Sequence, residues 1–271
     1  MSHISHGATQ GLCPVCCVKL EGIWSEGEFS AEKCPKCGLI LSMSATPFQF
    51  DERYFEHYVD STEERVRHFR HIIARLSVKL EAPILDVGAG VGFFIRALPL
   101  DLAQATTLVE PSDFARRYLR ETPAAAIFSS LEEIPLDCPP FATVTFWDVL
   151  AHVENPVEIL VRARGLMLDG GLLIIKTPYH PLRLFRAARL LVPIGKGRSL
   201  LHIPSMRAHF TPESLQELLR ATGFETISWQ WASEPPLAGR RGLILFRSLL
   251  LRLGKEIVTR NVSFITVATP S

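Results

Sequence analysis

The segment from Pro83 to Phe94, with the sequence PILDVGAGVGFF, constrains the fold more than any other part of this chain. Its apolar first half predicts a buried strand, and its apolar last residues predict the start of a helix. Three alternating glycines, Gly88, Gly90 and Gly92, separate the two. Glycine permits a positive φ and a close approach of the backbone to a ligand, and the helix offers free N–H groups at its start. The turn is therefore a predicted binding site for a polar ligand.

Two departures from common nucleotide motifs narrow the choice of ligand. A dinucleotide-binding loop has its third glycine at the position that Phe93 occupies here, and a phosphate loop carries Gly-Lys-Ser or Gly-Lys-Thr, which this segment lacks. Asp86, two residues before the first glycine, would repel a pyrophosphate. It suits a ligand that carries a positive charge beside the loop.

A second acid follows the next predicted strand. Residues 105–110 end in Glu110, which comes 24 residues after Asp86. In an alternating strand–helix topology, the ends of these two strands meet at one edge of a parallel sheet. A carboxylate at that place can accept hydrogen bonds from both ribose hydroxyls of an adenosine ligand. Glu110 also fits a nicotinamide enzyme, so the argument depends on its pairing with Asp86.

The acid and three glycines that follow the strand resemble the first motif of class I S-adenosylmethionine (SAM)-dependent methyltransferases, in particular those of ubiquinone and sugar type. Glu110-Pro111-Ser112 resembles the second motif, residues 127–135 the third, and residues 141–156 the fourth. The family usually has Phe-Asp where this chain has Phe141-Ala142. The resemblance covers roughly residues 50–271 and implies SAM as the cofactor. The implied cofactor-binding residues are Asp86, Gly88, Ala89, Gly90, Gly92, Glu110, Pro111, Ser130, Leu131 and Asp148.

The remaining periodic segments agree with the fold of that family. Further strands are predicted near 127, at 141–149, at 172–178, at 227–231 and at 262–268, and helices at 62–76, 93–98 and 157–168. Asp169-Gly170-Gly171 predicts a helix stop and a turn, and Thr211-Pro212 predicts the start of another helix. We expect a doubly wound α/β fold with a seven-stranded, mostly parallel, Rossmann-like sheet and a small N-terminal zinc ribbon.

The zinc ribbon is predicted from cysteine spacing. Cys13, Cys16, Cys34 and Cys37 form a C-x2-C-x17-C-x2-C frame, which is typical of a structural zinc site with four thiolate ligands. Two disulfides would conflict with an intracellular protein. Cys17 stands beside Cys16, and the spacing leaves open which of the two is the ligand. Residues 20–29 are expected to form the hairpin of the ribbon.

The base for methyl transfer is sought among the histidines. Methyl transfer requires the protein to bind the acceptor in line with the methyl carbon and the sulfur. A hydroxyl or carbon acceptor also requires a base that removes its proton. His152 resembles a histidine that often follows the fourth motif in ubiquinone-type and sugar methyltransferases, although it could equally cap or pack a helix. His202 and His209 lie on the acceptor side. Each is a candidate base or a hydrogen-bonding residue of a lid.

The domain organisation follows from these motifs. We expect a zinc-ribbon segment at 1–45 and a methyltransferase domain at 46–271, with acceptor-side insertions at about 180–209 and 235–258. Residues 1–169 carry 15 Lys and Arg against 23 Asp and Glu, and residues 170–271 carry 14 against 5. Such asymmetry indicates either contact with an anionic partner or packing of one half on the other. Both insertions combine apolar and basic residues, which favours an apolar, anionic acceptor, a membrane surface or a simple hydrophobic lid.

These features lead to an expected function. With 47% hydrophobic and 21% charged residues, no apolar run of transmembrane length and no secretory signal at Met1, the chain is expected to be cytoplasmic. We expect O- or C-methylation of a small-molecule or lipid-like acceptor, with peripheral membrane contact as an option. Nucleic acid is not expected as a partner, because the ribbon has three lysines against four acids. The alternatives are an rRNA or tRNA methyltransferase that uses the ribbon for RNA, and a SAM-binding protein without catalysis. The oligomeric state stays open.

Overall fold

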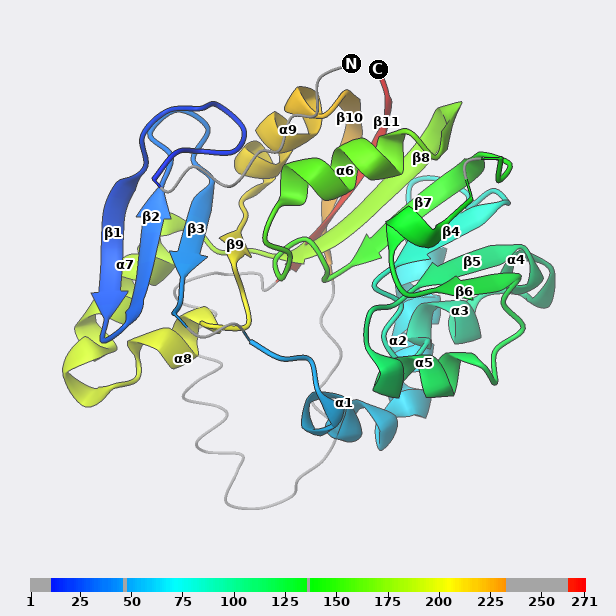
Figure 1. Cartoon of the computed structure of the whole chain (residues 1–271), viewed down its shortest axis with the longest axis horizontal. Coiled ribbons are helices and arrows are strands. Elements are labelled where there is room, and N and C mark those ends of the chain that lie inside the picture. Colours follow the sequence, from blue (N-terminus) through cyan, green and yellow to red (C-terminus); the bar gives the residue numbers. More distant parts are fainter. Residues whose placement is uncertain (1–10, 46–47, 136, 233–262) are drawn as a thin grey trace.

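The computed structural model describes residues 11–45, 48–135, 137–232 and 263–271, which form two sheets (Figure 1). The larger sheet has seven strands and carries helices on both faces. The smaller has four strands, three of which come from the N-terminal segment. Among the described residues, no helix is both long and apolar enough to cross a membrane.

The seven-stranded sheet has the order β10–β11–β8–β7–β4–β5–β6. Five strands are parallel, and β11 (Ser263–Pro270) is antiparallel to both of its neighbours, β8 and β10 (Phe224–Ala232). The order reverses at β4, so a crevice is expected beyond its carboxyl end. The predicted doubly wound fold is confirmed. The parallel strands are β4 (Ile84–Val87), β5 (Thr106–Val109), β6 (Ala126–Phe128), β7 (Phe141–Trp147) and β8 (Met167–Pro178).

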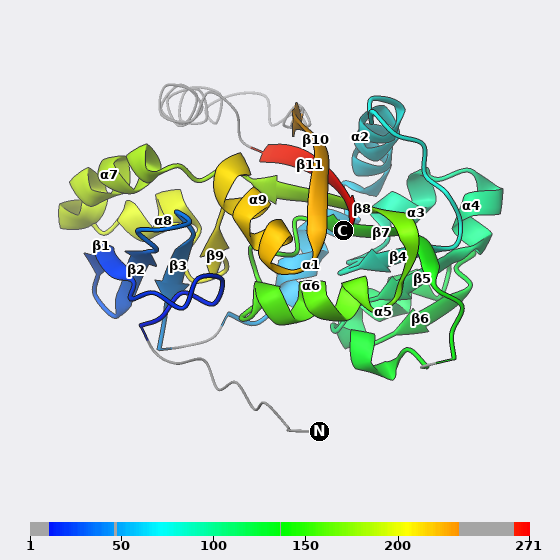
Figure 2. The same ribbon diagram turned by 90° about the horizontal axis from the view of Figure 1, so that it is seen from above.

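Helices cover the two faces of this sheet (Figure 2). On one face, α6 (Pro156–Arg164), α9 (Pro212–Ala221) and the short helix η1 (Leu131–Glu133) share a core with Leu85 and Val87 of β4. On the other face, α2 (Thr62–Ala74), α3 (Phe93–Ala97) and α4 (Leu100–Gln104) pack with Ile84. The connection after β5 forms α5 (Asp113–Leu119). Alternate residues of β4 therefore reach opposite cores, as expected for a strand buried on both faces.

Two local predictions around α6 and α9 have different outcomes. Helix α9 begins at Thr211 and Pro212, as the sequence predicts, and Thr211 and Ser214 form a reciprocal capping box there. The helix predicted at 157–168, however, ends at Arg164, and the following residues join β8 rather than a turn. Met167 pairs with Phe141 across the sheet, so the ladder of hydrogen bonds extends past the two glycines.

The smaller sheet has the order β1–β2–β3–β9 and is antiparallel. Its first three strands are β1 (Glu21–Glu26), β2 (Phe29–Lys33) and β3 (Ile40–Met43). The fourth, β9 (Ala208–His209), comes from within the predicted acceptor-side insertion and pairs with Ile40 and Leu41. The division at residue 45 stays a prediction.

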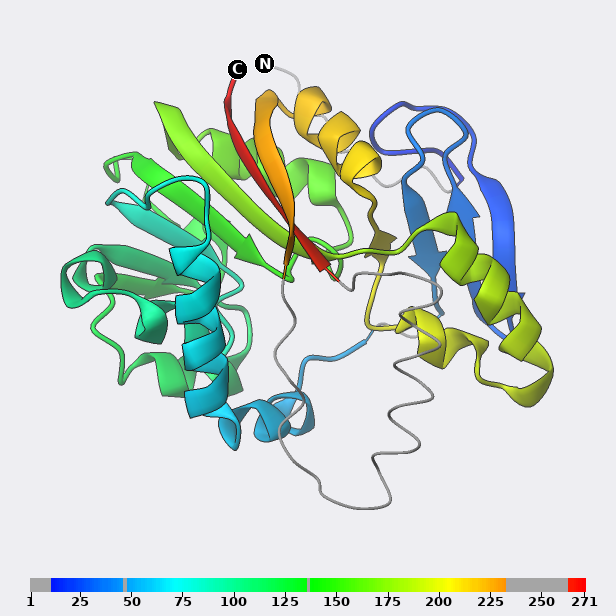
Figure 3. The same ribbon diagram turned by 180° about the vertical axis from the view of Figure 1, so that it is seen from behind.

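The insertion at 180–209 forms α7 (Leu182–Leu191), η2 (Val192–Ile194) and α8 (Gly197–Leu201). Viewed from behind, α7 lies across the ribbon sheet (Figure 3). Leu184, Phe185 and Ala188 of α7 share a buried cluster with Trp24 and Phe29 of the ribbon. The second predicted insertion, at 235–258, lies outside the described residues.

Candidate functional site

A cavity of about 610 Å³ lies beyond the carboxyl ends of the parallel strands. Residues that follow β4, β5, β7 and β8 form its floor. Helix α1 (Glu52–Val59) and the α7–α8 segment contribute to its walls. Of the residues predicted from the sequence to bind the cofactor or act as base, those that line the cavity are Asp86, Gly88, Ala89, Gly90, Glu110, Pro111, Asp148, His152 and His202.

The glycine loop is shaped by positive φ angles at Gly88 (74°), Gly90 (56°) and Gly92 (87°). The backbone N–H groups of Gly88 and Ala89 both donate to the carbonyl of Val109, which fixes the loop to the end of β5. A Cβ at Gly88 would lie 2.4 Å from Val149 Cγ2, so this position excludes a side chain by both conformation and space.

Two buried carboxylates lie beside this loop. Asp86 is 1% exposed; its Oδ1 accepts a hydrogen bond from Thr145 Oγ1 at 2.7 Å, and its Oδ2 has no partner among the described residues. Burial raises the pKa of Asp86 to about 7, the hydrogen bond from Thr145 opposes that rise, and the charge of Glu110 adds to it. A buried oxygen without a partner is costly, and a cationic ligand would remove the cost.

Glu110 is held by the loops on either side. Its Oε2 accepts from the Gly90 N–H at 2.7 Å and its Oε1 from the Ser112 N–H at 2.9 Å. Burial raises the pKa of this carboxyl, while the two N–H groups and Arg116 lower it. Since each carboxylate oxygen has a second lone pair, Glu110 keeps the capacity to accept ribose hydroxyls.

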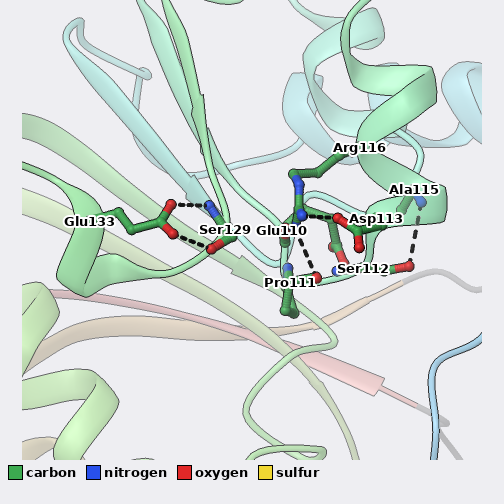
Figure 4. A network of polar contacts seen from close by, with 8 residues as sticks. All are labelled: Glu110, Pro111, Ser112, Asp113, Ala115, Arg116, Ser129 and Glu133. Atoms are coloured by element: carbon green, nitrogen blue, oxygen red, sulfur yellow. Dashed lines mark hydrogen bonds and ion pairs between the residues drawn. The ribbon is translucent and has the colours of Figure 1, made fainter.

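The loop after β5 is itself tightly bonded (Figure 4). Arg116 donates to the carbonyl oxygens of Glu110 and Pro111, at 2.6 and 2.8 Å, and forms an ion pair with Asp113. On the neighbouring strand end, Ser129 donates its N–H and its hydroxyl to Glu133. These contacts fix the position of Pro111 at the cavity.

Three predicted cofactor residues lie outside the cavity lining in the described part of the chain. Gly92 is the N-cap of α3, where a Cβ would meet Leu119 Cδ2 at 2.9 Å. Ser130 precedes η1, and Leu131 is buried in the core shared with α6. Their role in binding the cofactor, which for Ser130 and Leu131 is contact with the adenine, stays a prediction.

An ion pair between a buried lysine and a partly exposed aspartate lines the cavity. Lys176 Nζ lies 2.5 Å from Asp148 Oδ2, and the Lys176 side chain is 8% exposed. Asp148 adopts a φ of 60°, which residues other than glycine rarely do and which is typical of functional sites. Sequence reasoning missed Lys176, although a single lysine within the apolar run of β8 was a signal that it needs a partner.

The histidines lie at two depths. His152 and His202 line the cavity, and His152 Nδ1 lies 2.6 Å from the carbonyl oxygen of Ser205. Burial lowers the pKa of His152. His209 is 2% exposed and lies behind the lining, where its Nδ1 is 2.7 Å from Nδ1 of His180 and its Nε2 is 2.5 Å from Ser42 Oγ. His180 was not predicted from the sequence; it lines the cavity and is connected to the ribbon through His209 and Ser42.

Aromatic residues of α1 and the segment before it form the opposite wall. Phe50 contacts the His152 ring edge-on at a centroid distance of 5.2 Å, and Tyr54 contacts Phe50 at 4.9 Å. Burial raises the pKa of Tyr54, so its hydroxyl stays protonated. Arg65 of α2 lies 4.3 Å above the ring of Tyr58, which places a cation at this wall.

The four predicted zinc ligands converge at the ribbon. The sulfur atoms of Cys13, Cys16, Cys34 and Cys37 lie within 4.8 Å of one another. The sulfur–sulfur distance is 3.6 Å between Cys13 and Cys37, 3.8 Å between Cys16 and Cys34, and 3.9 Å between Cys13 and Cys16. A zinc ion with four Zn–S bonds of about 2.3 Å would set its sulfurs about 3.8 Å apart, so the residues fit this metal. Cys17 is exposed and lies outside this group.

Comparison with known proteins identifies relatives of part of the chain. The tRNA U34 carboxymethyltransferase of Ectopseudomonas mendocina is 28% identical over 154 residues, which cover 53% of this chain and 45% of the relative. The enzyme of the same name from Methylococcus capsulatus is 27% identical over 191 residues, covering 66% and 56%. The chain spans about half the length of the curated relatives it matches.

These names correct two expectations from the sequence. The expected small-molecule or lipid-like acceptor is wrong, and so is the expectation that nucleic acid is not a partner, because the relatives are named as enzymes of tRNA. The ribbon has three lysines against four acids, but five exposed basic residues, Arg183, Arg186, Arg189, Lys196 and Arg198, lie in the segment packed against it.

Two solved structures share the fold of this chain. A chain from the complex of the Haloferax volcanii Trm112 methyltransferase activator with a methyltransferase matches at a TM-score of 0.59 and 15% identity, covering 81% of this chain and 95% of that one. A SAM-dependent methyltransferase of Thermotoga maritima matches at 0.54 and 19%, covering 81% and 97%. At these identities the likeness concerns the fold alone.

The family model described as "Methyltransferase domain" matches residues 55–228, which is more than half of the chain. This confirms the resemblance drawn from the glycine loop and Glu110. The chain belongs to the methyltransferase domain family.

Proposed function

We propose that this protein is a SAM-dependent methyltransferase whose acceptor is a tRNA. The observation that carries the proposal is the pair of buried carboxylates, Asp86 and Glu110, beside a glycine loop at the strand-order reversal of the sheet. The family match supports the methyltransferase activity, and the names of the relatives support the acceptor class. The cytoplasm, where tRNA is found, is the proposed location.

The residues around the cavity suit SAM. The unpartnered Oδ2 of Asp86 would accept from the positively charged end of the cofactor, and Glu110 would accept from its ribose hydroxyls. Gly88, Ala89 and Gly90 line the cavity, and at Gly90 the nearest atom to an added Cβ would be 3.9 Å away, so the cofactor could approach the backbone closely there. When bound, SAM supplies an electrophilic methyl group on a sulfonium, so the protein has to align the acceptor and exclude water.

The acceptor side of the cavity would bind a nucleobase and accept a proton from it. Phe50 and Tyr54 offer aromatic faces on which an unstacked base can lie. His152, whose pKa burial lowers, is neutral at pH 7 and can accept a proton from the acceptor. His202 is the second candidate base at the lining, and His209 would act only through His180.

The four clustered cysteines are proposed to bind one structural Zn²⁺. Cys13, Cys34 and Cys37 are buried, and with Cys16 they supply four thiolates, which leaves no open position for water at the ion. The zinc would hold the ribbon together and take no part in the transfer.

A second candidate reaction is transfer of a carboxymethyl group, the group in the relatives' names. Arg65 lines the cavity and could pair with a donor carboxylate, whereas Lys176 is already paired with Asp148. The two reactions give tRNA products that differ in mass by one carboxyl group.

The test is transfer of label from methyl-labelled SAM to purified total tRNA, to ribosomal RNA and to an RNA-free metabolite extract. We expect label in tRNA and a single modified nucleoside by mass spectrometry. Asp86→Ala should abolish the transfer, while an exposed-surface variant, Lys79→Ala, should retain it. Labelling confined to ribosomal RNA or metabolites would refute the tRNA assignment. A product that forms only when a carboxylated SAM analogue replaces SAM would select the second reaction.

A further inference from the structure

The α7–α8 segment presents a continuous run of positive charge. No acid occurs between Asp169 and Glu213 in the sequence. Within this interval five cationic side chains are exposed on or next to the two helices: Arg183, Arg186, Arg189, Lys196 and Arg198. Such clustering on one element is the electrostatic signature of a surface that binds a polyanion.

The apolar face of α7 is turned to the ribbon. Leu184, Phe185 and Ala188 are buried against the ribbon sheet, while Arg183, Arg186 and Arg189 are exposed. Figure 3 shows the helix along the sheet, with α8 at its end. The ribbon thus covers the apolar side of the helix, while the basic side chains stay exposed, including Arg189, which also bonds to the ribbon.

Specific contacts fix the segment to the ribbon. Arg189 donates to the carbonyl of Ile23 at 2.5 Å, and the N–H of Arg198 donates to Glu26 Oε2 at 3.0 Å. At Gly197 a Cβ would lie 2.4 Å from Glu26 Oε2 and 2.7 Å from the carbonyl oxygen of Ala188, so only glycine permits this packing. The guanidinium of Arg198 lies 5.1 Å from the centre of the Phe29 ring.

The same segment reaches the cavity. Leu184, Leu200 and His202 line it, and Arg183 lies 5.7 Å from the ring centre of Tyr179, another lining residue. A polyanion bound along α7 and α8 would therefore lie beside the mouth of the cavity.

We propose that the exposed basic face of α7 and α8 binds the phosphate backbone of tRNA next to the target nucleotide, and that the zinc ribbon supports these helices rather than contacting the RNA. The inference rests on the proposed tRNA acceptor. It assigns the ribbon a positioning role, in which Glu26 accepts a hydrogen bond from the backbone of the basic segment.

The test compares two matched neutralising pairs. Arg186→Gln with Lys196→Gln removes two exposed cations from the proposed surface, and Lys19→Gln with Lys36→Gln removes two exposed cations from the ribbon. The first pair should weaken tRNA binding roughly tenfold and lower the slope of log K against log salt by about two, because each lost phosphate contact lowers it by about one. The second pair should bind tRNA as the wild type does. SAM affinity, measured by calorimetry, should be unchanged in both.

The outcomes separate this inference from the proposed function. If the wild type binds and modifies tRNA but the first pair behaves like it, or the ribbon pair is the weaker binder, the surface assignment is wrong and the function stands. If the wild type neither binds nor modifies tRNA, both fail.

Discussion

At the scale of single residues, Asp86 controls binding through its charge. A group with a pKa of about 7 is partly protonated near neutral pH, and a cationic ligand favours the ionised form. We expect SAM affinity to rise by up to about tenfold per pH unit below pH 7 and to level off above it. Calorimetric titrations at pH 6, 7 and 8 measure this. Asp86→Asn should bind more weakly and without the pH dependence; a wild-type Kd constant over this range would contradict the expectation.

His209 and Asp86 have opposite effects on how the stability of the fold depends on pH. Burial lowers the pKa of His209 to about 3, below its value of about 6.5 in an unfolded chain, so the unfolded state takes up the proton first. The stability conferred by neutral His209 is present above pH 6.5 and is lost as the pH falls from there towards 3. The raised pKa of Asp86 acts the other way between its ordinary value of 3.8 and about 7, because there the native state binds the proton more tightly.

Since the pH ranges over which His209 and Asp86 affect stability overlap, unfolding of the wild type alone does not separate their contributions. We expect the free energy of unfolding of the wild type to fall, relative to that of His209→Asn, by about 1.4 kcal/mol per pH unit between pH 6 and 4. Urea unfolding followed by tryptophan fluorescence at half-unit steps of pH gives the comparison. Parallel curves for the two proteins would show that His209 is protonated in the native state.

The residues that the sequence identified are those whose role depends on local spacing. Asp86, the glycines and Glu110 follow from a strand, a turn and a second strand. Lys176 and His180 do not, because their partners Asp148 and His209 lie 28 and 29 residues away and are brought together only by the sheet and the insertion. His209 is selected by its residue type, yet its position behind the cavity lining depends on Ser42, 167 residues earlier in the chain.

At the scale of elements, the cysteine cluster determines whether the ribbon holds its shape. We expect one zinc ion per chain by mass spectrometry of the metal, retained in Cys17→Ser and reduced in Cys16→Ser, because only Cys16 belongs to the converging group. Cys16→Ser should also lower the melting temperature and weaken tRNA binding more than SAM binding, since α7 is fixed to the ribbon and the glycine loop is not. Equal metal content in the two variants would argue that Cys17 substitutes for Cys16.

The sequence predicts the ends of helices and strands well where local residues determine them and poorly where pairing with a distant strand does. The start of α9 at Thr211 depends on local residues and is found where it was predicted. The start of β8 at Met167 is set by pairing with Phe141, which overrides the turn suggested by Gly170 and Gly171. Strand β9 has two residues and no pattern of its own; it exists because β3 offers an edge.

At the scale of the whole molecule, the ribbon and the methyltransferase core share one hydrophobic cluster. Cys34 and Leu39 belong to it together with Phe210 and Leu215. We therefore expect a single cooperative unfolding transition. Trp24 in the ribbon and Trp147 in the core are both buried and serve as two reporters, each isolated by Phe substitutions at the other three tryptophans. Coincident midpoints are the expected result, and two separated midpoints would mean that the ribbon unfolds independently.

The distribution of charge over the molecule explains why the acceptor was misjudged. Counting charge along the chain separates an acidic first part from a basic second part, but it does not reveal that they are packed together. Arg189 and Arg198 contact the ribbon through Ile23 and Phe29, so packing and an anionic partner are compatible explanations rather than alternatives.

The pairing of β3 with β9 has a consequence for the synthesis of the protein. A ribosome produces the first three ribbon strands long before β9, so the nascent ribbon has an open edge at Ile40 and Leu41 throughout most of translation. Such an edge can pair with other chains until its own strand arrives. Closure over so large a separation is also slow, because distant segments must meet before any contact stabilises them. Maturation of the ribbon is thereby delayed until most of the core that it joins has been made.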